Sequence, residues 1–276
     1  MQYIRKGRGV PFVKMQGCGN DYILVEEFLG EPLIARETIP ALCNRHTGIG
    51  ADGIIFIHLS DKADFEMEMY NADGSRGRMC GNGIRLVAKY VSDRGYLRRN
   101  SIIIESMGRT YTVKLLESAE THVMMASVDM GQVRITHKDG YEKILIKDAY
   151  FYITDVDAGN PHAVIVLNDI ENFDVAYWGP LIEKNERYPD RTNVEFVKVI
   201  DRETIEVRVW ERGSGETLAC GSGSTACAAA LRWHKLTGNH VHVRLQGGEL
   251  TVDYREENDS YILTGPAVEI FSGIIY

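Results

Sequence analysis

Length, composition and charge exclude several classes of protein. The 276 residues are 44% hydrophobic and 25% charged, with a net charge of −8, which is typical of a globular protein and unlike the Lys- and Arg-rich surfaces that bind nucleic acid. Because no apolar run reaches membrane-spanning length and residues 1–12 lack the apolar segment of a secretory signal, we expect a cytoplasmic protein with no membrane or nucleic-acid partner.

The predicted elements are mostly short strands, because β-branched or alternating segments bounded by Gly, Asn or Asp follow one another along the chain. In the first half they are Tyr22–Glu26, Gly53–His58, Phe65–Tyr70, Ile102–Glu105, Tyr111–Leu116 and His122–Asp129. In the second half they are Tyr150–Thr154, His162–Val166, Val194–Ile200, Thr204–Trp210, His240–Arg244, Glu249–Tyr254 and Tyr261–Thr264. The predicted helices are Arg36–Asn44, Gly83–Asp93, Val175–Asn185 and Ser224–Thr237. This order lacks the regular strand–helix alternation of a dinucleotide-binding fold, so we predict a mixed α+β fold.

The sequence contains a repeat with a constant offset. Cys80 of MCGNGIR and Cys220 of ACGSGST are 140 residues apart (220 − 80 = 140). Three further pairs keep this offset: Asn20 with Asn160, Asn71 with Glu211, and Gly108 with Gly248. A tandem duplication explains the constant offset. We therefore predict two pseudosymmetric halves, residues 1–145 and 146–276, each with many strands around one principal helix that begins at its cysteine.

Each of these cysteines precedes a stretch of good helix formers, so its thiol is expected at the start of a helix. The first turn of a helix has unpaired N–H groups and a partial positive charge, which lower the pKa of a thiol and can hold a carboxylate. A lone cysteine there is more often a packing residue, but two at matched positions favour catalysis. A thiolate base and a thiol acid on opposite faces of an α-carbon would invert it. We predict Cys80 and Cys220 as this pair and interpret Cys43 and Cys227 as packing residues.

Polar residues near the two motifs suggest how an amino acid would be held. Asn71 and Glu211 each stand nine residues before a thiol (80 − 71 = 9; 220 − 211 = 9). Arg212 offers a planar fork for a carboxylate, Glu211 can accept from an ammonium group, and His162 can stabilise a thiolate as imidazolium. The alternatives are structural: a tight turn at Asn71, a solvated strand end at Glu211, and a histidine that is only packed.

No cofactor and no metal are expected. The chain has five cysteines, none of them in a C-x-x-C pair, and no Cys/His cluster has the spacing of zinc ligands. No lysine stands in the phosphate-site context of a pyridoxal enzyme. An odd number of cysteines without a secretory signal indicates reduced thiols in a reducing compartment.

Five segments of the chain resemble the diaminopimelate epimerase family and follow the family's order. They are KMQGCGNDYILV at Lys14–Val25, NRHTGIGADGIIFI at Asn44–Ile57, NADGSRGRMCGNGIR at Asn71–Arg85, AGNPHAVIV at Ala158–Val166 and ERGSGETLACGSGSTACAAA at Glu211–Ala230. The resemblance implies a cofactor-independent epimerase that interconverts LL- and meso-diaminopimelate in lysine biosynthesis. It also implies two pseudosymmetric halves, each a β-barrel-like sheet around a central helix, with the active site in the cleft between them.

The resemblance assigns roles to residues of this sequence. It implies that Cys80 and Cys220 are the acid/base pair and that His162 and Glu211 are catalytic residues beside the thiols. The substrate-binding residues that it implies are Asn20, Asn71, Gly81, Asn82, Asn160, Asn193, Arg212, Gly221 and Ser222.

Gln16, Cys18, Gly53, Arg76 and Arg78 depart from the family's common pattern, and two of these departures bear on the expected site. Gly53 stands where some members contribute a substrate-facing Gln, and it matches Asn193 at the same offset (193 − 53 = 140). The two halves therefore differ in polarity there, which suits a substrate with two distinct ends or reflects drift after duplication. Cys18 replaces an apolar residue and adds a thiol near the entrance of the expected site.

Three other functions stay open at this point. The first is a racemase of another amino acid, such as histidine, on the same scaffold. The second is an isomerase of the same broad fold with a carboxylate base, against which the two cysteines argue. The third is a non-catalytic dithiol redox sensor in which Cys80 and Cys220 form a disulfide. The expected partner is a small-molecule substrate, and the chain could also form a homodimer.

Overall fold

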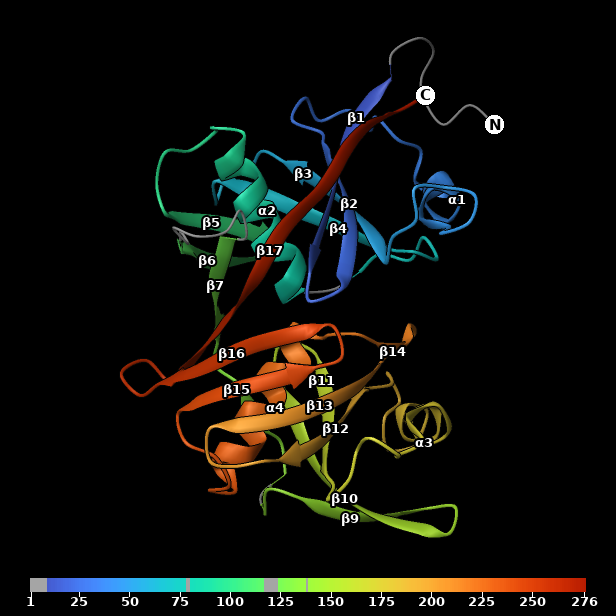
Figure 1. The fold of residues 1–276 in the computed structure, drawn as a ribbon, viewed down its shortest axis with the longest axis vertical. Coiled ribbons are helices and arrows are strands. Elements are labelled where there is room, and N and C mark those ends of the chain that lie inside the picture. Colours follow the sequence, from blue (N-terminus) through green and yellow to red (C-terminus); the bar gives the residue numbers. More distant parts are fainter. Residues whose placement is uncertain (1–8, 78–79, 117–123, 138) are drawn as a thin grey trace. The chain divides into compact units, whose positions relative to one another are not determined.

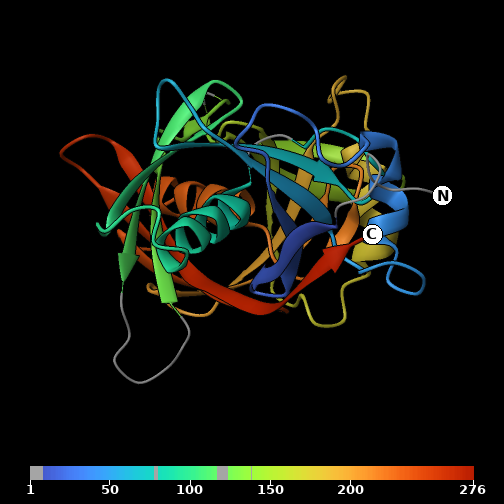
Figure 2. The same ribbon diagram turned by 90° about the horizontal axis from the view of Figure 1, so that it is seen from above.

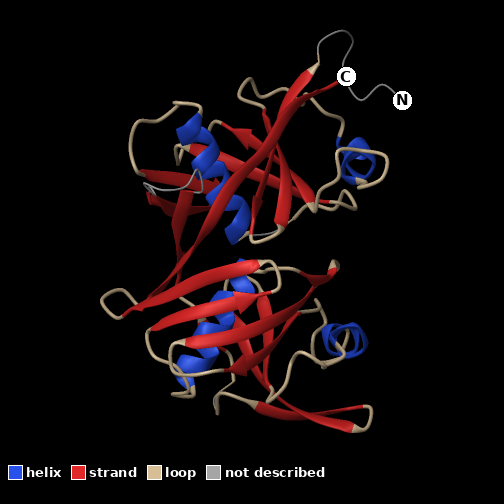
Figure 3. Ribbon diagram, viewed as in Figure 1, coloured by secondary structure: helices blue, strands red, loops and turns tan. Residues whose placement is uncertain are grey.

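The structure consists of two compact units, each with a mixed sheet and one long helix (Figures 1 and 3). It is a computed structural model that describes residues 9–77, 80–116, 124–137 and 139–276. Unit 1 comprises Met1–Val128 with Gly265–Tyr276, and unit 2 comprises Asp129–Thr264. Among the described residues, no helix is both long enough and apolar enough to cross a membrane.

Unit 1 is built mainly from strands around helix α2. Its elements in chain order are β1 (Val10–Gly17), β2 (Asn20–Glu26), the 3-10 turn η1 (Arg36–Thr38), α1 (Ile39–Cys43), β3 (Gly53–His58), β4 (Phe65–Asn71), α2 (Gly81–Asp93), β5 (Ser101–Ser106) and β6 (Arg109–Leu116). Two more strands belong partly to each unit, β7 (Met124–Gly131) and β17 (Ser260–Ile275). Helix α2 contacts β1, β2, β4, β5 and β6, so strands flank it on more than one side (Figure 2).

Unit 2 surrounds helix α4 in a similar way. Its elements in chain order are β8 (Arg134–Ile135), β9 (Glu142–Ile146), β10 (Ala149–Asp157), β11 (Pro161–Val166), α3 (Val175–Glu183), β12 (Asn193–Val199), β13 (Thr204–Glu211), β14 (Gly215–Thr217), α4 (Gly221–Trp233), β15 (His240–Leu245) and β16 (Gly248–Arg255). Helix α4 contacts β8, β10, β11, β12 and β16.

The order of strand pairing is the same in both units. In unit 1, β1 to β6 pair in sequence as antiparallel, parallel, antiparallel, parallel and antiparallel neighbours. In unit 2, β10, β11, β12, β13, β15 and β16 repeat this pattern. Tyr22 pairs with Gly53 in unit 1, and His162 pairs with Asn193 in unit 2, which keeps the offset of 140 in both partners. The duplication seen in the sequence therefore extends to the register of the sheets.

Strands β2 and β3 are buried on both faces, which explains their continuous apolar runs. On one face, Ile23 and Ile54 belong to a hydrophobic cluster with Ile39 of α1. On the other face, the Cδ1 atom of Ile55 lies 3.0 Å from the point that a Cβ on Gly83 of α2 would occupy. Both strands therefore lie between the short helix α1 and the long helix α2, whose N-cap is Cys80.

The predicted α+β class, with strands around a central helix in each half, is confirmed by these elements and contacts. The compact units are bounded differently from the predicted halves at 145 and 146. Strand β17 returns to pair with β1, from Val10 with Ile275 to Gln16 with Val268, and so brings the end of the chain into unit 1. The strand predicted at His122–Asp129 begins outside the described residues and is observed from Met124.

Candidate active site

The first turn of α2 holds the thiol of Cys80. Cys80 is the N-cap residue, with extended backbone (φ −134°, ψ 104°), and its sulfur accepts a hydrogen bond from the N–H of Gly83 at 3.3 Å. The Sγ atom also lies 3.4 Å from Tyr22 Oη and, at 4.0 Å, can donate its proton to Asn20 Oδ1. The predicted helix start is confirmed, and it places donors and an acceptor around one sulfur.

A chain of amide hydrogen bonds fixes the orientation of Asn20. Its Nδ2 donates to Asp52 Oδ2 at 2.9 Å, so its Oδ1 faces the thiol and accepts from Asn82 Nδ2 at 3.1 Å. The Oδ1 of Asn82 accepts in turn from the Nη2 of Arg85 at 2.8 Å. Arg85 is fully buried, and burial lowers the pKa of its guanidinium. These hydrogen bonds therefore hold Asn20 and Asn82, both predicted to bind substrate, in one orientation.

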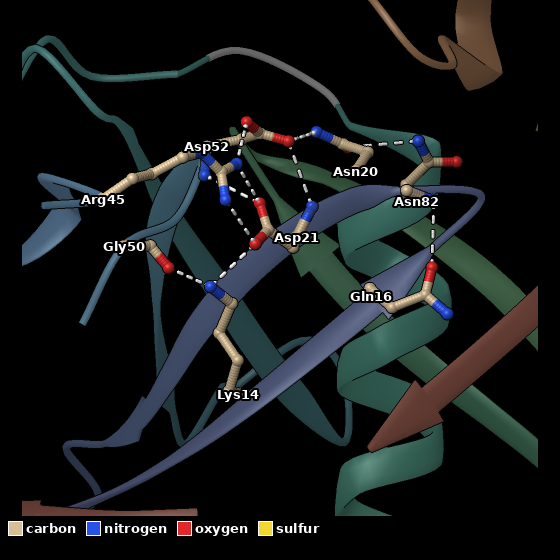
Figure 4. A network of polar contacts seen from close by, with 9 residues as sticks. Lys14, Gln16, Asn20, Asp21, Arg45, Gly50, Asp52 and Asn82 are labelled. Carbon is tan, nitrogen blue, oxygen red and sulfur yellow. Dashed lines mark hydrogen bonds and ion pairs between the residues drawn. The ribbon is translucent and has the colours of Figure 1, made fainter. Parts of the chain in front are cut away.

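An ionic network holds Asp52 in place (Figure 4). The guanidinium of Arg45 bridges Asp52 and Asp21, at 2.8 and 2.7 Å. Asp21 also pairs with the buried Lys14 at 2.7 Å, and the ammonium of Lys14 donates to the carbonyl of Gly50. Burial acts to raise the pKa of Asp21, but hydrogen bonds from Arg45 and Lys14 outweigh it and lower that pKa below its usual value. Asp21 is thus ionised at neutral pH, and the network ties β1 and β2 to the segment before β3.

The first turn of α4 holds the thiol of Cys220 in matched geometry. Cys220 is the N-cap (φ −130°, ψ 118°), and its sulfur accepts from the N–H of Gly223 at 3.4 Å and lies 3.5 Å from Ser222 Oγ. The prediction that the helix start lowers the thiol pKa is wrong here. Burial, followed by the charges of Glu211 and Glu195, raises the pKa of Cys220 well above 9.0 despite the bonds from Ser222 and Gly223. Cys220 therefore carries its proton at neutral pH.

His162 lies in a buried polar cluster of unit 2. Its Nδ1 is 2.7 Å from Glu195 Oε1, and its Nε2 is 2.9 Å from Asn160 Oδ1. The side chains of His162 and Glu195 are both fully shielded from solvent. The ring thus stands between a carboxylate and an amide oxygen, both of which accept hydrogen bonds. The thiolate-stabilising role that the sequence suggested for His162 stays a prediction.

The remaining predicted residues of unit 2 form a second polar group. Asn193 donates to the carbonyl of Pro161 at 3.0 Å and accepts from the N–H of Arg212 at 3.0 Å. The guanidinium of Arg212 donates to the carbonyl of Asp190 at 3.0 Å. Glu211 accepts from the hydroxyl of Thr217 at 2.6 Å, and its charge acts on Cys220. Gly221 is buried in the first turn of α4.

Two predicted substrate residues of unit 1 lie on either side of the thiol in the sequence. Gly81 is buried at the first position of α2. Asn71 ends β4, where its amide donates to Ser75 Oγ at 3.0 Å, and Ser75 also binds Asp73 in the same turn. The turn predicted for NADG is thus observed, and a substrate contact by Asn71 stays a prediction.

The comparisons with known proteins decide the family. The sequence model described as diaminopimelate epimerase matches residues 12–136 and 154–270. The chain belongs to this family. The diaminopimelate epimerase of Agathobacter rectalis is 44% identical over 285 residues, covering 96% of this chain and 98% of the relative. Those of Brachyspira hyodysenteriae (44% identical) and Heliobacterium modesticaldum (40% identical) also match over at least 95% of this chain and 98% of their own length. The predicted family is confirmed, and with it the prediction of an isomerase of the epimerase type.

Solved structures share the fold at low sequence identity. A probable proline racemase from Agrobacterium radiobacter K84 superposes with a TM-score of 0.77 at 13% identity, covering 97% of this chain and 93% of that chain. A hydroxyproline epimerase from Agrobacterium vitis superposes with a TM-score of 0.76 at 13% identity, covering 99% of this chain and 94% of that chain. These likenesses support the fold alone.

The departure from the family at Gly53 has a structural reason. A Cβ at this position would lie 2.3 Å from the carbonyl oxygen of Tyr70 and 3.0 Å from Cε1 of Tyr22. The backbone oxygen cannot move aside as a side-chain end could, so a glutamine here would displace the strand or the Tyr22 ring. In this chain the ring of Tyr22 takes the space that a side chain at position 53 would need.

The second departure, Cys18, occupies the turn between β1 and β2. It is 2% exposed and has a left-handed backbone (φ 55°). Its predicted place near the entrance of the site stays a prediction. The interpretation of Cys43 and Cys227 as packing residues agrees with their burial, which raises the pKa of Cys43 to about 11 and that of Cys227 well above 9.0.

Sequence reasoning missed two residues that contact the site. Tyr22 contacts the Cys80 sulfur, and Glu195 contacts His162. The offset of 140 would have found the first, because it maps Tyr22 onto His162. The second carries a weaker signal: Glu195 is a charged residue among the apolar residues of its strand, and its matched residue is Ile55.

No cluster of three or more His, Cys, Asp or Glu able to hold a metal occurs among the residues that the structure describes. The expectation of a reaction without metal or cofactor stays a prediction.

Proposed function

We propose that this protein inverts the α-carbon of LL-diaminopimelate to give meso-diaminopimelate, with Cys80 and Cys220 as acid and base. One observation carries the proposal. Both thiols are N-caps of the central helices, and each accepts a hydrogen bond from the glycine three residues on, at 3.3 and 3.4 Å. The family membership supports the substrate, since the relatives at 40–44% identity are named diaminopimelate epimerases.

The two sulfurs are prepared for different proton states. Cys220 holds its proton because burial and the charges of Glu211 and Glu195 oppose a thiolate. It therefore starts as the acid that delivers a proton to the α-carbon. Cys80 starts as the base: it takes the α-proton on its sulfur, where the N–H of Gly83 stabilises the negative charge that it brings to the reaction. In the reverse direction the two roles are exchanged.

The first turns of both helices can meet the negative charge of the substrate. In each turn the third N–H is used by the sulfur, while the first two N–H groups have no acceptor within the helix. These donors belong to Gly81 and Asn82 in unit 1 and to Gly221 and Ser222 in unit 2. A carboxylate placed there gains hydrogen bonds and the helix dipole, and both strengthen as charge builds on it during proton removal.

Polar side chains would distinguish the two ends of the substrate. We propose that Arg212 and Asn193 bind a distal carboxylate, that Glu211 accepts from an ammonium group, and that Asn20, Asn71 and Asn160 bind remaining polar atoms. The bonds between Asn193 and the backbone of Arg212, and between Asn20 and Asp52, support this because they hold the side chains in one orientation before substrate arrives. His162 would stabilise a thiolate from its buried pair with Glu195.

The proposal extends to the cellular role. We propose that the protein acts in the cytoplasm in lysine biosynthesis, on a small-molecule substrate and without added cofactor or metal. The acidic net charge of −8 and the relatives' names support this placement.

The deciding experiment is isotope exchange. LL-diaminopimelate is incubated with the protein in deuterated buffer with a reductant and no added metal or cofactor. We expect deuterium at the α-carbon together with meso product, and activity that survives a chelator. A panel that includes histidine and proline tests the racemase alternative. Exchange with another amino acid alone would reassign the substrate. Absence of exchange with every member, combined with reversible formation of a Cys80–Cys220 disulfide, would support the redox sensor instead.

A further inference from the structure

The side chain of Tyr22 has a defined place beside Cys80. It projects from β2, is 6% exposed, and brings its hydroxyl to 3.4 Å from the sulfur. The ring fits because its neighbour in β3, Gly53, has no side chain: a Cβ there would lie 3.0 Å from Tyr22 Cε1. The absence of a side chain at Gly53 in β3 therefore allows Tyr22 in β2 to point its hydroxyl at the thiol of Cys80.

The groups around the Cys80 sulfur serve both of its protonation states. The Oδ1 of Asn20 only accepts, so at 4.0 Å it favours the thiol. The N–H of Gly83 only donates, so at 3.3 Å it favours the thiolate. The hydroxyl of Tyr22 can do either, since an O–H group donates and accepts. The hydroxyl of Tyr22 can therefore form a hydrogen bond with the sulfur whether Cys80 is a thiol or a thiolate.

The matched residue of unit 2 shows why Tyr22 turns to the thiol. His162 stands 140 residues after Tyr22 and bonds to Glu195. The position that matches Glu195 is Ile55, which is apolar and packs near Gly83. Because position 55 is an isoleucine, it provides no carboxylate to Tyr22. The hydroxyl of Tyr22 contacts the sulfur of Cys80 instead.

Resting on the proposed function, we propose that Tyr22 is a further catalytic residue, whose hydroxyl donates a hydrogen bond to the Cys80 thiolate and keeps that thiolate available as the base. When Cys80 takes the α-proton, the S–H bond forms and the C–H bond breaks. Tyr22 keeps its own proton throughout. Its hydroxyl donates a hydrogen bond to the thiolate before the transfer and contacts the neutral thiol afterwards. No other reactant is needed. Charge-assisted hydrogen bonds are about twice as strong as neutral ones, so the thiolate gains more from Tyr22 than the thiol does.

Other charges also act on Cys80, so the test must hold them constant. Among the described residues, buried Arg85 of α2 acts on Cys80 through its charge. Asp52 lies one hydrogen bond further away, through Asn20. Tyr22→Phe removes only the hydroxyl and leaves both of these groups and the aromatic ring in place.

The experiment measures Cys80 alkylation by iodoacetamide against pH, residue by residue, by peptide mass spectrometry. We expect Tyr22→Phe to raise the apparent pKa of Cys80 by about one unit, which lowers its alkylation rate at neutral pH about tenfold. Deuterium exchange into diaminopimelate should fall by a similar factor. Replacing Tyr22 with a fluorinated tyrosine, which keeps the ring and makes the hydroxyl a stronger donor, should shift the alkylation profile in the opposite direction. Tyr111→Phe, which removes a buried phenol of β6, is the control and should leave Cys80 unchanged.

The outcomes separate this proposal from the function on which it rests. Alkylation needs no turnover, so absence of exchange in the unaltered protein would reject the epimerase and leave the profile of Cys80 measurable. An unchanged Cys80 profile in both Tyr22 variants would overturn the role of Tyr22, whatever happens to turnover. Reduced exchange without a shift in that profile would also overturn it, because it would assign Tyr22 to substrate binding or packing. If Tyr22→Phe fails to fold, the fluorinated variant alone decides.

Discussion

In unit 1 the sulfur of Cys80 lies 3.4 Å from the hydroxyl of Tyr22, whereas in unit 2 the matched His162 bonds to Glu195 at 2.7 Å. The two first turns keep the same cap geometry, with a glycine N–H on each sulfur. The duplication thus preserved the backbone at the start of each helix and changed the side chains at the matched positions 22 and 162.

The difference would suit the proposed reaction, which needs an acid and a base at the same moment. Two thiols in identical surroundings would have the same pKa, so nothing would decide which of them starts as the base. The charges of Glu211 and Glu195 raise the pKa of Cys220, whereas Cys80 has the hydroxyl of Tyr22 at 3.4 Å and interacts with the charge of Arg85. In the proposed mechanism, the duplicated backbone places the two thiols, and the side chains that differ between the units set their proton states.

The largest test of the comparison removes each thiol. Cys80→Ala and Cys220→Ala should each lower the rate of inversion by about 10²–10⁴-fold, because each removes a proton-transfer group. The folded state should remain, since each change deletes a single sulfur. Deuterium exchange and circular dichroism measure the two effects. Cys43→Ala, at a buried thiol of α1, is the matched control and should retain activity. Near-normal turnover in either of the first two variants would contradict the two-thiol mechanism.

A smaller effect is expected from the charge that distinguishes unit 2. Glu195→Gln removes a negative charge that raises the pKa of Cys220, so this pKa should fall by about one unit. Loss of the charged partner of His162 should also lower the exchange rate roughly tenfold. Alkylation of Cys220 against pH provides the first readout. Glu216→Gln, whose carboxylate pairs with Arg208 at 2.7 Å, is the control. A Cys220 profile that is unmoved by Glu195→Gln would show that the asymmetry has another origin.

Gly83 and Gly223, whose N–H groups bond to the two sulfurs, should differ in how much stability is lost when each is replaced by alanine. A Cβ at Gly223 would lie 2.6 Å from Glu195 Oε1, whereas one at Gly83 would lie 3.0 Å from the end of the Ile55 side chain. Gly223→Ala is therefore expected to cost about 1–3 kcal/mol by overpacking, and Gly83→Ala less than about 1 kcal/mol. Midpoints of urea unfolding compare the pair directly. Equal midpoints would mean that Glu195 does not constrain the first turn of α4.

The smallest effect concerns acid stability of unit 1. The folded pKa of Asp21 lies below its usual 3.8, so its contribution to stability is present above that usual value and is lost as the pH falls through the folded pKa. Asp21→Asn should therefore be less stable than the unaltered protein at neutral pH, and the gap should close by on the order of 1 kcal/mol in acid, after allowance for solvent screening. Thermal unfolding across the pH range measures it, with the exposed Asp61→Asn as control. A gap independent of pH would contradict the assignment.

The site was only partly predictable because its residues carry signals of different strength. The Cys-Gly-x-Gly steps identify both caps, since a helix start follows from local sequence. Glu195 is different: in the sequence it is a charged residue among the apolar residues of its strand, and only the burial of that strand on both faces turns it toward His162 and Gly223. The raised pKa of Cys220 could not be predicted either, because it results from burial and from two carboxylates that stand nine and 25 residues away along the chain (220 − 211 = 9; 220 − 195 = 25).

The sequence by itself determined the family, the α+β class, the duplication with its offset of 140, and the two capped helices, because these depend on local patterns and on motifs that repeat. Tertiary structure decided the return of β17 to β1, the space that Gly53 leaves for Tyr22, and the unequal surroundings of the two sulfurs. The physical reason is that strand pairing, side-chain clearance and desolvation arise between residues far apart in the chain, and no local pattern records them.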